Sequence, residues 1–67
     1  MNAQQIAMAN AIDVFTTDLS NSCTDEDRMY SVRFLARRIG IDKANQVAEL
    51  FGLTGDYFKA NAQTLNN

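Results

Sequence analysis

The chain has 67 residues, 46% of them hydrophobic, which suits one folded domain spanning residues 1–67 and leaves no room for a second. Its single cysteine, Cys23, and its lack of histidine exclude an intrachain disulfide and a His/Cys metal site, so no metal and no cofactor is expected. The net charge of −2 is unevenly spread, because residues 1–27 carry −5 whereas residues 28–67 carry six cations against three acids, a net +3.

Location and fold class follow from what the sequence lacks. No apolar run is long enough to span a bilayer, and the start MNAQQIAMANAIDVF lacks the basic segment of a signal peptide. Together with the free cysteine, this predicts a cytoplasmic protein. The chain has no proline and only three glycines, which favours helices joined by short connections.

The first predicted helix covers residues 3–19. Four apolar side chains recur along it at spacings of four, three and four: Met8, Ile12, Phe15 and Leu19. This stripe either packs onto the later helices as core or forms a seam with a second copy. Ile6 and Val14 lie off the stripe, so the helix is apolar on two faces. We therefore expect a homodimer and predict the four stripe residues as its dimerisation surface.

The second predicted helix begins after Thr24, which we expect to be its N-cap, and ends at Ile39 before Gly40. Tyr30 and Phe34 are expected to widen its inward face. The third helix, KANQVAELF, is expected to have Asp42 as its cap.

The fourth helix is expected to have Thr54 as its cap and an inward stripe of Phe58, Ala62 and Leu65. The predicted fold is therefore all-α: a compact bundle of four short helices, the last two forming a helix-turn-helix-like corner.

Ala48 and Gly52 have the spacing that a helix-turn-helix requires, a small residue at the crossing and a glycine at the turn. The segment VAELFGLTGDYFKA resembles the helix-turn-helix of bacterial transcription regulators, loosely including the AraC class. The resemblance covers about twenty residues and implies a DNA-binding dimer. Its second helix holds one cation, Lys59, beside Asp56, and one lysine supplies little of the phosphate neutralisation on which DNA binding depends. The sequence favours a helical corner over a DNA-reading one.

A basic cluster on the second and third helices could hold phosphate or an acidic protein surface, and otherwise forms a solvated face. The candidate residues for binding a partner or nucleic acid are Arg33, Arg37, Arg38, Lys43, Tyr57, Lys59, Asn61 and Gln63.

Catalysis is not expected. Asp13 and Asp18 are five residues apart, roughly 140° around a helix, and so do not converge on one water or metal. The remaining interpretation is a small non-enzymatic regulatory protein that binds a protein partner, of the type of phage and plasmid accessory proteins. The alternative is a dimeric helix-turn-helix regulator that binds DNA. Exposure of Tyr57 and Lys59 on a protruding helix beside Arg37 and Arg38 would favour the alternative.

Overall fold

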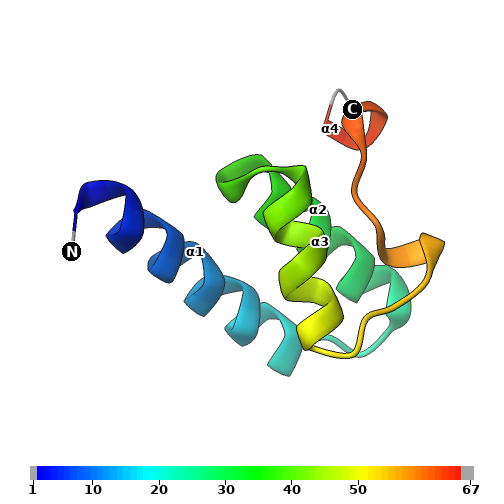
Figure 1. Cartoon of the computed structure of the whole chain (residues 1–67). Helices are drawn as coiled ribbons and strands as arrows, with labels where there is room; N and C mark the ends of the chain where they lie inside the picture. The colour runs from blue at the N-terminus through cyan, green and yellow to red at the C-terminus, as the bar shows by residue number, and fades with distance from the viewer. Residues whose placement is uncertain (1, 66–67) are drawn as a thin grey trace.

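The computed structural model describes residues 2–65, and these residues are helical or irregular, with no strand among them. Three helices follow one another: α1 (Ala3–Ser20), α2 (Asp25–Ile39) and α3 (Ile41–Leu50). A 3-10 turn, η1 (Asp56–Phe58), and a single helical turn, α4 (Ala62–Leu65), follow in the C-terminal segment (Figure 1). The all-α prediction is confirmed, whereas the predicted bundle of four helices is not.

The first turns of α1 and α2 are capped by side chains that accept hydrogen bonds from backbone N–H groups. Asn2 caps α1 reciprocally: its side chain accepts a hydrogen bond from the Gln5 N–H at 2.9 Å, and the Gln5 side chain accepts one from the Asn2 N–H at 3.1 Å. Thr24 caps α2 as predicted, accepting from the Asp27 N–H at 3.1 Å. Arg37 and Arg38 lie in the last turn of α2, where positive charge is favourable.

One residue, Gly40, both ends α2 and begins α3. Its φ of 94° with ψ of 159° is a conformation open almost only to glycine. The predicted cap of α3 by Asp42 is wrong, because the helix starts at Ile41 with no side-chain cap and Asp42 lies inside its first turn. The sharp turn at Gly40 leaves no linker in which a capping residue could sit.

The helix α2 lies between α1 and α3 and packs on both. The core is small and rich in alanine, which lets the helices approach closely. Its buried members are Ala11, Phe15, Val32, Leu35, Ala36, Ala44, Ala48 and Ala60. Phe15 is its largest side chain and meets Phe51 edge to face, with ring centroids 5.4 Å apart.

The predicted fourth helix is broken, and its predicted cap is wrong. Thr54 is followed by Gly55 at a φ of 99°, and η1 begins after Gly55 with no side-chain cap. Ala60 then lies in irregular backbone, where the Asn45 side chain accepts from its N–H at 2.9 Å and donates to its carbonyl at 3.1 Å. Because a continuous helix would use the Ala60 N–H within its own backbone, this side-chain clamp replaces the helix.

The predicted inward stripe of that helix is not formed either. Phe58 is half-buried and Ala62 is exposed, while the side chain of Leu65 lies outside the part that the structure describes.

Candidate interaction surface

The structure separates the eight predicted binding residues into three places. Arg33 and Arg37 lie on α2 with the two aromatic residues described next. Arg38 and Lys43 lie near the groove between α1 and α2. The remaining four belong to the C-terminal segment: Tyr57, Lys59, Asn61 and Gln63.

The face of α2 turned away from the core carries a strip of alternating aromatic and arginine side chains: Tyr30, Arg33, Phe34 and Arg37. We call this the aromatic–arginine strip. The guanidinium of Arg33 lies 5.4 Å from the centroid of the Tyr30 ring, and that of Arg37 lies 5.6 Å from the Phe34 ring. Tyr30 is 44% exposed and Phe34 is 54% exposed. The prediction that these two rings widen the inward face of α2 is therefore wrong.

The strip is held in place by its own contacts. A guanidinium stacks on a ring through its flat face, and its N–H groups lie at the edge, in the plane of the group, which is the geometry in which carboxylates bind. Arg33 is only partly exposed, and its Nε is buried with no hydrogen-bond partner among the described residues. The inner part of this side chain is thus packed against the protein, so less conformational freedom is lost when a partner binds.

The C-terminal candidates do not form a recognition helix. Tyr57 is exposed but lies in the 3-10 turn, with its ring 5.2 Å from that of Phe58. Lys59 is in irregular backbone and pairs loosely with Asp56 at 3.8 Å. The Asn61 side chain accepts from the Gln63 N–H at 2.9 Å, so it is engaged at the start of α4. No helix in the described part carries Tyr57 and Lys59 beside Arg37 and Arg38.

The apolar stripe predicted for dimerisation faces the core of its own chain. Phe15 is 2% exposed, and Ile12 and Leu19 are partly buried against the same cluster. Met8 is half-buried. Phe15 has little exposed surface, so it packs in the core of its own chain, the first of the two alternatives given for the stripe, while dimerisation through the stripe stays a prediction.

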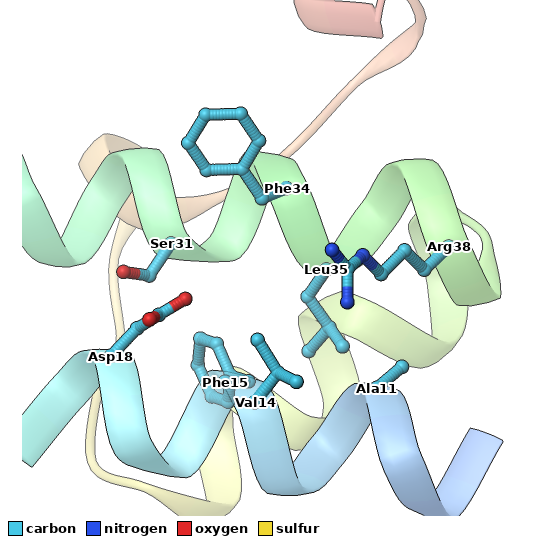
Figure 2. A pocket seen from close by; sticks show the side chains of 8 residues that line it. All are labelled: Ala11, Val14, Phe15, Asp18, Ser31, Phe34, Leu35 and Arg38. Atoms are coloured by element: carbon cyan, nitrogen blue, oxygen red, sulfur yellow. The ribbon is translucent and has the colours of Figure 1, made fainter. Parts of the chain in front are cut away.

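A groove runs between α1 and α2 beside the aromatic–arginine strip. Its central part has a volume of about 260 Å³ and is lined by residues of both helices: Ala11, Val14, Phe15, Asp18, Ser31, Phe34, Leu35 and Arg38 (Figure 2). Phe34 therefore lies at the boundary between the strip and the groove. Val14, 43% exposed, stands on the opposite wall.

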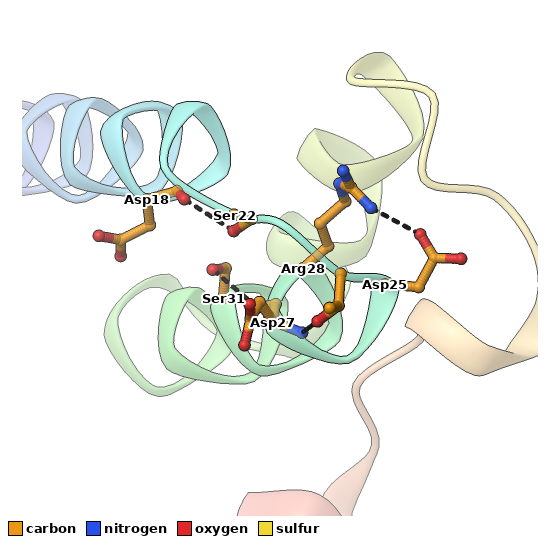
Figure 3. Close-up of polar contacts among 7 residues, drawn as sticks. Asp18, Ser22, Asp25, Asp27, Arg28 and Ser31 are labelled. Carbon is orange, nitrogen blue, oxygen red and sulfur yellow. Dashed lines mark hydrogen bonds and ion pairs between the residues drawn. The ribbon is translucent and has the colours of Figure 1, made fainter.

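Acidic side chains gather at one end of this groove (Figure 3). Asp18 and Asp27 both line it where α1 ends and α2 begins. Ser22 donates to the Asp18 carbonyl at 2.7 Å, and Ser31 donates to the Asp27 carbonyl at 3.1 Å. These bonds use backbone oxygens, so both carboxylates stay exposed to solvent.

The aromatic half of the strip was missed as a surface. A usable signal was present, because α2 carries apolar residues around most of its circumference, more than one buried face accommodates.

Comparisons of the chain with protein-family models, with curated proteins and with solved structures found no match. None of the described helices is both long enough and apolar enough to cross a bilayer.

Proposed function

We propose that this protein is a non-enzymatic binding module that recognises an acidic surface of a partner protein through the aromatic–arginine strip of α2. One observation carries the proposal: two arginines stacked on two exposed rings along one helix face, opposite the core. Tyrosine, phenylalanine and arginine are enriched at protein–protein interfaces, and tyrosine and arginine dominate their binding energy.

The chemistry of the strip specifies the partner's surface. The exposed rings favour apolar contact, and the guanidinium edges favour carboxylates, which they bind in a fork. The complementary surface therefore combines Asp or Glu residues with an apolar centre. The strip spans eight positions of α2, from Tyr30 to Arg37, or about 10 Å along the helix, so it forms the centre of an interface rather than the whole of one.

The dimeric DNA-binding regulator is supported less well. It needs a continuous second helix over residues 55–65 to enter the major groove, and that segment is divided between η1, irregular backbone and α4. It also needs several cations on that segment to contact phosphates, whereas its cation is Lys59, which pairs with Asp56 at 3.8 Å.

The test compares proteins captured from cells of the source organism by the wild-type chain and by variants. Arg37→Glu removes one cation of the strip, and its matched control is Lys59→Glu, the same charge change on the C-terminal segment. Phe34→Ser removes one ring, and its matched control is Leu50→Ser, at an exposed apolar residue on α3. Captured proteins are identified by mass spectrometry, purified and titrated against each variant.

We expect Arg37→Glu and Phe34→Ser each to weaken binding of the same acidic protein by about tenfold or more, with both controls unchanged. Binding should also weaken as salt rises. The proposal fails if the strip variants and their controls bind alike. Wild-type binding to duplex DNA in a fluorescence anisotropy titration at about 50 mM salt would instead support the DNA-binding alternative.

A further inference from the structure

The groove between α1 and α2 continues beyond its central part at both ends. Toward the start of α1 it is lined by Gln4, Ala7 and Met8 on one side and by Arg38 and Lys43 on the other. Toward the end of α1 it reaches Asp18 and Asp27. Neighbouring parts share lining residues, so the groove follows α1 from Gln4 to Asp18, roughly 21 Å at the rise of an α-helix.

The charges along this groove are polarised. Cations, Arg38 and Lys43, lie at one end, and carboxylates, Asp18 and Asp27, lie at the other. Figure 2 shows Asp18 and Arg38 at opposite ends of the central part, with Val14 and Phe34 between them. Among residues 2–65, neither Asp18 nor Arg38 has an ion-pair partner.

A surface with this arrangement is complementary to itself. In a two-fold dimer the same patch meets its own copy, so a contact from one residue to a second is repeated in reverse. A two-fold axis that lies in the interface, midway between Asp18 and Arg38 and at right angles to the line joining them, brings the groove of one protomer onto the groove of the other in the opposite direction. Each Asp18 then faces Arg38 of the other protomer, while Val14 and Phe34 meet their own copies near the axis.

We propose that the α1–α2 groove is the dimerisation surface of this protein and that a second copy of the chain occupies it, with reciprocal Asp18–Arg38 pairing. Charge complementarity selects this occupant: a protomer turned by half a revolution presents cations to the acidic end and carboxylates to the basic end. Such a dimer covers Val14 and the groove side of Phe34, both exposed in the single chain. Covering them extends an apolar core that is small in a chain of this length.

This dimer is a separate claim from recognition of an acidic partner. Phe34 belongs to both surfaces, so a variant at Phe34 cannot distinguish them. Asp18 and Arg38 lie outside the aromatic–arginine strip, and they provide the test of the dimer. If the dimer is absent, partner binding through Arg37 remains measurable and is judged by its own variants.

The experiment is a reciprocal charge reversal on the full chain. The variants are Asp18→Arg, Arg38→Asp and the double variant, and the matched control is Asp13→Arg, an exposed acid on α1 outside the groove. Association is followed by sedimentation equilibrium over a wide range of concentration and salt. Native mass spectrometry reports which protomers pair in an equimolar mixture of the two single variants. Circular dichroism confirms that each variant is helical.

We expect the wild type and the Asp13→Arg control to dimerise alike, and more weakly at high salt. Each single variant sets two like charges face to face in its homodimer and should raise the dissociation constant by about tenfold or more. The double variant should dimerise again, and the mixture should form the heterodimer in preference to either homodimer, because both restore opposite charges at both contacts.

Three results overturn the proposal: a monomeric wild type at every concentration, single variants that dimerise as the wild type does, or a mixture without preferential heterodimer. Rescue in the mixture is the decisive arm, since loss of folding in a single variant cannot produce it.

Discussion

The Asn45 side chain is a polar link between α3 and the C-terminal segment, and replacing it with alanine should release that segment. Asn45 makes two hydrogen bonds to Ala60, which is 3% exposed. Each bond of this kind contributes a net ~0.5–1.5 kcal/mol, or about 1–3 kcal/mol for the two. Alanine is the better helix former by up to about 0.7 kcal/mol, which offsets part of the loss. With the full offset, the net destabilisation expected for Asn45→Ala is therefore about 0.3–2.3 kcal/mol.

The location of the effect distinguishes this clamp from a general weakening. If the C-terminal segment of Asn45→Ala stayed docked, the N–H and the carbonyl of Ala60 would each be buried without a hydrogen-bond partner, at a cost of ~1–3 kcal/mol apiece. Detachment of the segment exposes both groups to water and therefore costs less free energy. We therefore expect the Ala60 amide proton to lose its protection from hydrogen exchange, while amides of α2 such as that of Leu35 remain the best protected. Global stability is read from urea denaturation followed by circular dichroism.

The matched control is Gln46→Ala, at the exposed neighbouring position of α3, which should leave both measurements close to wild type. A protected Ala60 amide in Asn45→Ala, together with an unchanged denaturation midpoint, would refute the assignment of the clamp.

Three further substitutions test the helix ends and the core. Thr24→Ala removes the cap of α2 and should lower stability by about 1 kcal/mol in urea denaturation, whereas Thr17→Ala, at an exposed position inside α1, should not lower it, because alanine is the better helix former. Gly40→Ala should cost about 1–3 kcal/mol by thermal denaturation, although the added methyl group meets no other part of the protein within 4 Å beyond its chain neighbours. An unchanged melting temperature would show that the backbone strain is absent. Leu35→Ala should cost about 2–5 kcal/mol, most of the stability of so small a domain, and a variant with wild-type helical signal and melting temperature would contradict the assigned core.

The sequence by itself determined the helix class and most helix boundaries, because these depend on neighbours in the chain. Thr24 before three acids, and Gly40 after two arginines, are local signals that the structure repeats. Apolar spacing likewise identified the buried stripe of α1, although not which of its two alternatives applied. The cap at Asn2 is equally local and was missed, although the Gln three residues later is its ordinary sign.

Only the tertiary structure decided the C-terminal segment and the surfaces. Ala60 lies in irregular backbone because a side chain fifteen residues earlier binds its backbone, and propensity within residues 54–65 contains no trace of that contact. The outward position of Tyr30 and Phe34 depends on which side of α2 the helices α1 and α3 occupy. A helix with apolar residues around most of its circumference can bury only the faces that its neighbours cover, and the packing of the whole chain makes that choice.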